Sequence, residues 1–362
     1  MARYSWSVIY DALTNITDVQ NITITRGRQQ ITDVFRGATA VIEGRNVSAL
    51  PIIEIGQQIE IVASQGIDDF TMFYGIVADV QITYGFVSAM DTYKISCEDS
   101  LAIAGRGLTS DSFSWGSGLT AFGAAEAVLA DAFGSSLILN GVDTGALVSA
   151  QSAPNTNVLT LLNQLMQTEQ GYLSGQNEAV IDWYGRNDYS GQPVIGVFTD
   201  GTGVTIEETS KFDTVVFRSM ADSFFEQTVV EPKGLASVSS GTGKRVYTLQ
   251  TFDKDLNQSQ SLADYLLATL QVQEQVPSTI SVMSEVQTNN VAIQAAKEAG
   301  TGRRCGLILR SDGYDVFVEG STVTATPEQS RFTFNLVSSE ALVFFILDSL
   351  AFGVLDSNRL GY

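Results

Sequence analysis

Three arginines have the most distinctive chemistry in this chain, because they gather in one short stretch of an acidic protein. Arg26, Arg28 and Arg36 fall within eleven positions, whereas the 362 residues together carry 20 Lys and Arg against 40 Asp and Glu, a formal net charge of -20. A planar guanidinium pairs well with a carboxylate through two hydrogen bonds. The cluster is therefore either a solvated basic loop or a subunit interface, where these side chains meet acidic groups of a neighbour.

Other reactive groups argue against an enzyme. The sequence contains no histidine, which removes the Ser-His-Asp and Cys-His pairs and nearly all catalytic zinc sites. Adjacent carboxylates occur at Asp68-Asp69, Glu98-Asp99 and Glu207-Glu208. Neighbours on a strand point to opposite faces, so the members of a pair cannot easily share a proton. Residues 182–188 hold two aspartates and an asparagine but lack the spacing of a calcium loop. We expect no catalytic residue, metal or cofactor, with a structural cation in a partner interface left open.

Two glycine-rich stretches have the composition of phosphate loops but not their spacing. Residues 241–245 contain Gly243-Lys244, yet Val238 and Arg245 stand where a Walker A loop needs Gly and Ser or Thr. Residues 116–118 follow no apolar strand, as a dinucleotide-binding turn would require. We interpret the first as a hairpin loop and the second as a linker.

The charge balance and the hydropathy limit the possible partners. An excess of carboxylates repels phosphates, so we expect no stable nucleic-acid binding. No apolar run reaches the roughly 18 residues of a membrane span, and the first residues lack the apolar core of a signal peptide. We therefore expect assembly in a cytoplasm, where Cys97 and Cys305 are predicted to be buried free thiols and not a disulfide.

The hydrophobic pattern predicts the elements that position these residues. Trp6, Val8 and Tyr10 alternate with polar residues, and similar short strands separated by Gly and Asn turns continue to about residue 105, as in an antiparallel barrel. From about residue 119 the period becomes helical. Two helices are predicted, from 119 to a stop at Gly134 and from 157 to 170, followed by a hairpin at 172–184.

The second half of the chain returns to strands. We predict strands at 204–206, 215–217, 226–230 and 246–249, a helix over 259–273 that ends before Pro277, a short helix within 289–304 and strands over 306–345. The expected domains are an N-terminal barrel at 1–110, an α+β domain at 111–203, a second barrel at 204–288 and a C-terminal β domain at 289–362. A chain of this length exceeds one ordinary core.

Two distant segments resemble a known family. The first segment resembles the start of the minor tail proteins that form the hub at the tip of long-tailed phages. It consists of a strand, Arg26-Gly27-Arg28, a polar spacer, Phe35-Arg36-Gly37 and a second strand. Residues 344–362 look like the closing segment of that family, and residues 260–270 resemble its helix between two barrel strands. The resemblance implies a β-rich fold, mainly β with α+β, of several barrel-like domains and an appended helix-hairpin domain.

The same resemblance implies a function. It predicts a structural virion protein of the tail tip, a trimeric ring that continues and closes the tail tube and opens for DNA ejection. The ring would contact a distal tail protein and the tape measure protein, and would carry tail fibres or receptor-binding proteins. The arginine cluster would then lie at a subunit boundary. The alternatives are a distal tail protein forming a hexameric ring, a carbohydrate-binding module, or a cell-wall glycosidase with two carboxylates.

Overall fold

The computed structural model describes residues 4–29, 33–142, 145–175, 179–185 and 194–199, the strands between 209 and 250, and residues 251–254, 257–260, 262–263, 275–283, 290–310 and 312–338. Among these residues, no helix combines the length and the apolar character that crossing a membrane requires. The predicted closing segment at 344–362 and the loop at 241–245 lie outside the described residues, as does most of the predicted helix at 259–273.

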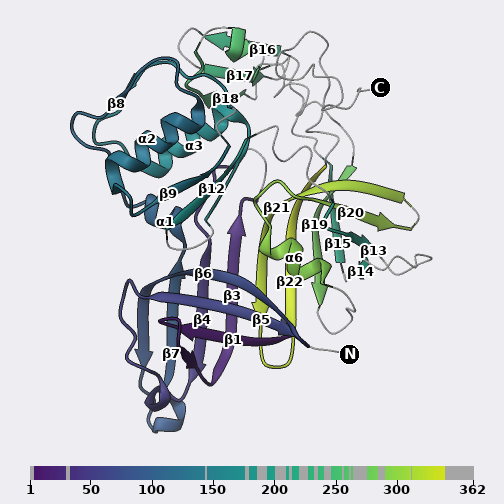
Figure 1. Cartoon of the computed structure of the whole chain (residues 1–362). Helices are drawn as coiled ribbons and strands as arrows, with labels where there is room; N and C mark the ends of the chain where they lie inside the picture. Colours follow the sequence, from purple (N-terminus) through teal and green to yellow (C-terminus); the bar gives the residue numbers. More distant parts are fainter. Residues whose placement is uncertain are drawn as a thin grey trace.

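The first unit is a half-closed barrel. Its strands are β1 (Ser5–Tyr10), β2 (Thr14–Ile16), β3 (Val19–Gly27), β4 (Thr39–Arg45), β5 (Gln58–Gln65), β6 (Asp68–Thr83) and β7 (Thr92–Glu98). Two short 3-10 helices lie in its loops, η1 (Val47–Ala49) and η2 (Ser88–Met90), and α1 (Ser100–Ala104) follows β7. The strand order is β3-β4-β7-β6-β5-β1-β2, and Figure 1 shows β1 and β5 crossing β3 and β4 as the sheet curls over its core. The predicted alternation is confirmed, since Val8 and Tyr10 are buried.

The second unit, which from here on we call the second barrel, has strands from both sides of the predicted boundary at residue 289. It contains β13 (Val197–Thr199), β14 (Thr209–Lys211), β15 (Thr214–Ser219), β19 (Gln275–Met283), α6 (Val291–Lys297), β20 (Arg304–Leu309), β21 (Asp312–Ala325) and β22 (Ser330–Ser338). The short helix predicted within 289–304 is α6. Because β19 pairs with both β15 and β22, one sheet crosses that boundary. The division into four domains stays a prediction.

A single fourteen-stranded sheet joins the two units. The connection is an antiparallel pairing of β3 with β21, in which Ile24 lies opposite Val323 and Gly27 opposite Gly320. A bulge in β21 between Val318 and Gly320 leaves Glu319 without a partner on β22. Bulges bend a strand and redirect one side chain. Here the redirected side chain is the completely buried carboxylate of Glu319.

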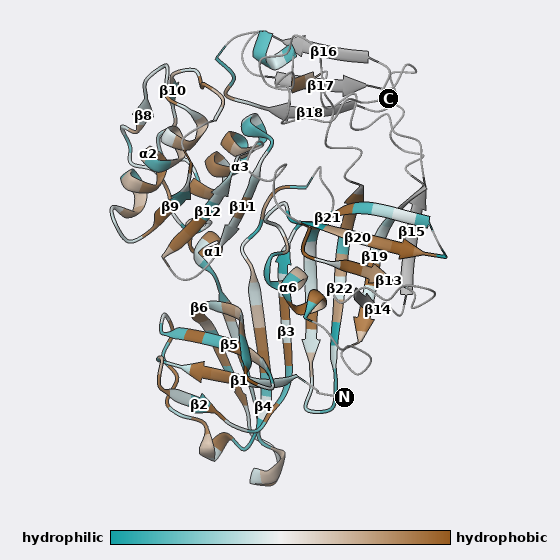
Figure 2. Ribbon diagram, turned by 45° about the vertical axis from the view of Figure 1, so that its right-hand side comes forward, coloured by the Kyte–Doolittle hydropathy of each residue, from teal (hydrophilic) through white to brown (hydrophobic). Residues whose placement is uncertain are grey.

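The appended domain follows the prediction closely. Its elements are α2 (Ala121–Phe133), α3 (Val158–Glu169), the sheet of β9 (Ile138–Gly141), β11 (Tyr172–Gly175) and β12 (Val180–Tyr184), and the pair β8 (Ser114–Trp115) and β10 (Gln151–Ser152). Thr120 and Asn157 cap the two helices by accepting bonds from the backbone N–H groups of Gly123 and Thr160. A small sheet of β16 (Gln227–Glu231), β17 (Leu235–Ser239) and β18 (Val246–Gln250) completes the described strands. Figure 2 shows α2 and α3 above the first barrel and beside the sheet of β9, β11 and β12, and buried apolar residues of both helices share one core cluster with Tyr172, Leu173, Ile181 and Trp183 of that sheet.

Candidate functional site

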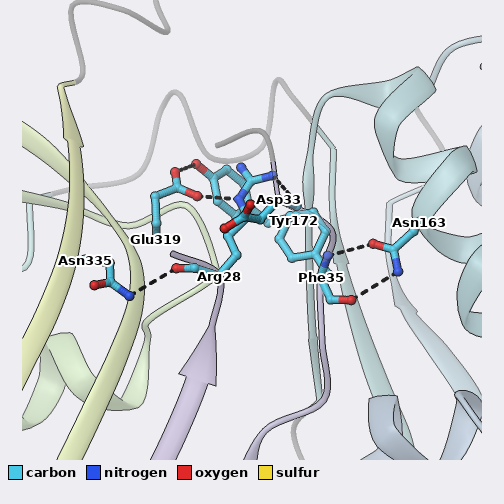
Figure 3. Close-up of polar contacts among 7 residues, drawn as sticks. All are labelled: Arg28, Asp33, Phe35, Asn163, Tyr172, Glu319 and Asn335. Atoms are coloured by element: carbon cyan, nitrogen blue, oxygen red, sulfur yellow. Dashed lines mark hydrogen bonds and ion pairs between the residues drawn. The ribbon is translucent and has the colours of Figure 1, made fainter. Parts of the chain in front are cut away.

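The segment after β3 lies where the two barrels and the appended domain meet. Arg28 donates from Nε to Oε2 of Glu319 at 2.5 Å, and its backbone N–H donates to the Glu319 carbonyl at 2.9 Å. The side chains are 8% and 0% exposed, so this ion pair is buried. Tyr172 of β11 donates its hydroxyl to the other carboxylate oxygen, Oε1, at 2.5 Å (Figure 3). One carboxylate of the second barrel therefore binds both the first barrel and the appended domain.

Aromatic rings complete the environment of Arg28. Its guanidinium carbon lies 4.4 Å from the centre of the Phe35 ring and 5.0 Å from that of Tyr172, and the two rings pack edge to face. Burial by itself lowers the pKa of Arg28, but the attraction to Glu319 and the hydrogen bonds outweigh it and raise the pKa above its usual value. The guanidinium is held as a permanent cation.

Arg26 makes a second set of contacts within the chain. Its guanidinium donates to the carbonyl of Lys297 at the end of α6 and to that of Met72 in β6, the latter at 3.0 Å. It thereby connects the first barrel with the helix of the second. Burial lowers the pKa of Arg26, and the nearby carboxylate of Asp99 opposes that shift.

Arg36 differs from the other two arginines. Its side chain is exposed and lines a cavity of about 350 Å³ with Leu159 and Gln167 of α3. Beside it, Asn163 of α3 binds the backbone of Phe35 by accepting from its N–H at 2.7 Å and donating to its carbonyl at 3.1 Å. The structure thus brings Arg26 and Arg28 into contacts within the chain and leaves Arg36 at the surface. The subunit interface stays a prediction for all three.

Gly27 allows the close approach on which the junction depends. Its φ is +74°, and a Cβ there would lie 2.2 Å from the carbonyl oxygen of Glu319. Only glycine adopts this positive φ and allows this close approach without strain. The middle residue of Arg26-Gly27-Arg28 therefore lets β3 end directly against the bulge of β21.

Asp99 forms a second buried polar centre near this junction. It caps α1 by accepting from the Ala102 N–H at 3.0 Å, and it accepts from the Ala38 N–H at 2.9 Å. Burial raises the pKa of Asp99 to about 6, although these hydrogen bonds and the charge of Arg26 act in the opposite direction. A Cβ on Gly175 of β11 would lie 2.2 Å from Oδ2 of Asp99, so the appended domain contacts this carboxylate directly.

The remaining sequence candidates occupy ordinary structural positions. Asp68 and Asp69 begin β6 and are exposed, and Glu98 pairs with Arg106 at the surface. Asp182 accepts hydrogen bonds from Asn140 and Tyr184. Among the described residues, no group of three His, Cys, Asp or Glu side chains could hold a metal ion. Glu207, Glu208 and residues 186–188 lie outside the described part of the chain.

The two cysteines are free and buried, as predicted. Burial raises the pKa of the Cys97 thiol to about 12 and raises that of Cys305 above its usual value. Both thiols are therefore unreactive core residues.

The partners of the arginines were not predicted from the sequence. Glu319 is the one acidic residue in the apolar run from Val316 to Gly320, and a carboxylate at such a place is the only signal that the sequence offers for it. Nothing in the sequence marks Tyr172 or Asn163, because both fit the apolar or amphipathic pattern of their elements.

The arrangement serves to hold domains together. Its groups are a permanent cation, a fully bonded carboxylate, aromatic rings and an amide that binds backbone. None of them is an activated nucleophile. Removing either partner of such a pair leaves a charge buried and uncompensated, which strongly destabilises the fold.

Comparisons with known proteins identify the fold. No family model matches the chain, and no curated protein matches it by sequence. A tail protein from Neisseria meningitidis MC58 has a TM-score of 0.60 at 14% identity, with 92% of this chain and 96% of that one covered. The 43 kDa tail protein of prophage MuSo2 from Shewanella oneidensis has a TM-score of 0.61 at 13% identity, with 94% and 98% covered.

A third structure belongs to a different system. The E. coli c3393 protein is a component of the type VI secretion system and is described as similar to the bacteriophage T4 tail proteins gp27 and gp5. It has a TM-score of 0.51 at 12% identity, with 96% of this chain and 78% of that one covered. The predicted β-rich fold of barrel-like domains with an appended helix-hairpin domain is confirmed, and the chain has the fold of these tail proteins.

Proposed function

We propose that this chain is a structural protein of a phage tail tip, where it forms the hub ring that continues and closes the tail tube. The observation that carries the proposal is the arrangement of two barrels in one continuous sheet with an appended domain. The match to two tail proteins extends over more than nine tenths of each chain, which supports a shared architecture and not a shared module.

The proposed ring contains three copies. Two barrels in each chain would present six similar units to a sixfold tube, so that each copy replaces two tube subunits. The distal tail protein and the tape measure protein would contact the ring on the side of the tube, and fibres or other receptor-binding proteins would attach on the far side. The ring would open for DNA after the host is recognised.

We further propose that the chain is not an enzyme and acts mechanically. The absence of histidine from the sequence and the structural use of Arg28, Glu319 and Asp99 support this. A charge of -20 for each copy gives a ring of three about -60, which would repel phosphates from the channel wall. DNA would then pass without adhering.

Measuring the mass and symmetry of the assembled protein tests this proposal. Native mass spectrometry and a cryo-EM symmetry search are expected to give three chains, and antibody labelling of virions is expected to mark the tail tip. A ring of six chains would favour the distal tail alternative. Antibody label distributed along the tail tube, or no antibody label on the tail, would contradict the proposal.

A further inference from the structure

Three loops at one end of the first barrel expose apolar side chains. They are the turn after β1, the loop from β4 to β5 that contains η1, and the tip between β6 and β7 that contains η2. Strand register places the start of the β4–β5 loop beside the tip between β6 and β7, because Arg45 at the end of β4 lies opposite Thr92, and Thr92 lies opposite Thr83. The other end of the same loop lies beside the turn after β1, since the Glu54 N–H donates to the Tyr10 hydroxyl at 2.9 Å. In Figure 1 the short helical turns η1 and η2, found by the colours of residues 47–49 and 88–90, lie at the end of the barrel away from α2 and α3.

We call this surface the apolar end. Its members are Leu13, Ile52, Ile55, Tyr84, Phe86, Val87 and Met90. Phe86 is 100% exposed. Together with Ile82 beside them, these seven residues make up half of the large exposed hydrophobic residues in the described part of the chain. Such concentration in one place is unusual for surface residues that have no partner.

The loop from β4 to β5 shows that this exposure is selective. Val47, Leu50 and Ile53 turn inward and pack against the barrel core, whereas Ile52 and Ile55 of the same loop face outward. The loop therefore packs on the core through these three side chains. Ile52 and Ile55 take no part in that packing.

The amount of apolar surface is sufficient for an interface. Phe86 and Tyr84 alone offer on the order of 300 Å² that a partner could cover. Exposed apolar patches of a few hundred Å² mark interaction sites on soluble proteins. Aromatic residues at the centre of such a patch contribute most of the binding energy.

Charges around the apolar end indicate what kind of surface covers it. Four carboxylates and one guanidinium lie in these loops and the strand residues next to them, within residues 11–18 (which include β2), 45–57 and 84–91, at Asp11, Asp18, Glu54, Asp91 and Arg45. The same face of a second copy would set carboxylates against carboxylates, and an anionic lipid surface would be repelled in the same way. A surface with Lys and Arg around apolar residues would complement it.

We propose that the apolar end is the docking site for a different protein, whose contact surface is apolar at its centre and basic at its rim. Phe86, the most exposed aromatic side chain of the apolar end, is the anchor of the contact. The inference rests on the proposed function only in expecting that partner among the proteins of the same tail.

Site-specific photocrosslinking tests the proposal. A benzoylphenylalanine is placed at Phe86 in the full chain expressed from its own locus, and a matched one replaces Ile67, which is 99% exposed in the turn at the other end of β5. Position 86 is expected to crosslink to a peptide of another protein that carries apolar residues flanked by Lys or Arg. Position 67 is expected to give no such product. Crosslinks from position 86 to a second copy, to lipid or to nothing would overturn the proposal.

Affinity measurements with the partner identified by crosslinking provide a second test of the docking site. Phe86→Ser is expected to raise the dissociation constant at least about 30-fold, and Ile67→Ser to leave it unchanged. Increasing the salt concentration is expected to weaken binding, because opposite charges meet at the rim. An unchanged constant for Phe86→Ser would refute the proposal. Both substitutions are at exposed sites, so unchanged thermal unfolding verifies that each variant is folded.

The two proposals fail separately. If labelling locates the chain in the tail but position 86 gives no crosslink, the docking site is wrong and the proposed function stands. If position 86 crosslinks to a basic-rimmed apolar surface in a protein unrelated to tails, the proposed function is wrong and the docking site stands.

Discussion

The carboxamide of Asn163 binds the backbone of Phe35 as a neighbouring strand would, accepting from its N–H at 2.7 Å and donating to its carbonyl at 3.1 Å. This one side chain connects the helical part of the appended domain to the loop that follows β3. Because Phe35 is also buried, both backbone groups depend on Asn163 for their hydrogen bonds.

Replacing Asn163 with alanine is expected to lower the free energy of unfolding by roughly 2–4 kcal/mol, since two buried backbone groups lose their partner. Asn15→Ala removes an exposed asparagine of β2 and is expected to change it by less than about 0.5 kcal/mol. Chemical denaturation measures both. Equal values for the two variants would show that the Phe35 backbone finds another partner.

The ion pair of Arg28 and Glu319 is expected to contribute far more than a surface pair. Glu319→Gln leaves the Arg28 cation buried without its counter-charge and is expected to cost about 3–5 kcal/mol. Arg106→Ala breaks a pair whose side chains are 56% and 26% exposed, and is expected to cost less than about 1 kcal/mol. Urea titration compares them, and a Glu319 variant as stable as the Arg106 variant would contradict the assigned role.

Asp99 is expected to make stability depend on pH in an unusual direction. Because burial raises its pKa to about 6 in the folded chain, the folded state keeps a proton that the unfolded state has lost between about pH 4 and 6. The contribution of Asp99 to the free energy of unfolding therefore falls as the pH rises through that window, by roughly 3 kcal/mol. Subtracting the curve of Asp99→Asn isolates this term. A difference that is flat from pH 4 to 6 would refute it.

Both thiols are expected not to react with thiol reagents in the native protein. Cys97 and Cys305 lie in the barrel cores with raised pKa values, so a thiol reagent at pH 8 should modify neither until the chain unfolds. Counting reactive thiols with and without denaturant gives the result. Fast modification of either cysteine in the native state would mean that its barrel opens locally.

Arg36 is the arginine of the cluster whose charge can be changed without removing a contact inside the junction. If it lies at a subunit boundary, Arg36→Glu is expected to shift the protein from rings toward single chains, because a carboxylate would then face the neighbour's carboxylates. Lys94→Glu, an exposed reversal on β7, makes the same change in net charge and is expected to leave the ring intact. Mass photometry distinguishes the two. Rings that persist in the Arg36 variant would exclude this residue from the interface.

Local patterns were sufficient to predict most elements of the fold. The alternation in β1, the stop of α2 at Gly134 and the start of α3 near Asn157 each depend on a few neighbouring residues, which the sequence displays directly. The short strand β17 was not predicted, since Ala236 and Ser237 lack the residue types that favour strands.

Long-range relationships could not be predicted in the same way. The arginine cluster was recognised from its composition, but its contact with Glu319 joins residues that are 291 positions apart. That contact depends on a bulge in β21 and on a register between β3 and β21 that no local pattern specifies. Gly27 stands between the two arginines in the sequence, but the need for glycine there depends on its close approach to β21, which no local pattern indicates.

The antiparallel pairing of β3 with β21 also determines how the protein carries load. Six residue pairs, from Gly27 opposite Gly320 to Ala325 opposite Ile22, lie side by side between the two barrels. A force that pulls the barrels apart along the strands loads these hydrogen bonds together in shear, whereas a force across the strands would break them one after another. A chain with this seam resists axial tension far better than lateral peeling, so the direction of a pull decides whether the two barrels separate.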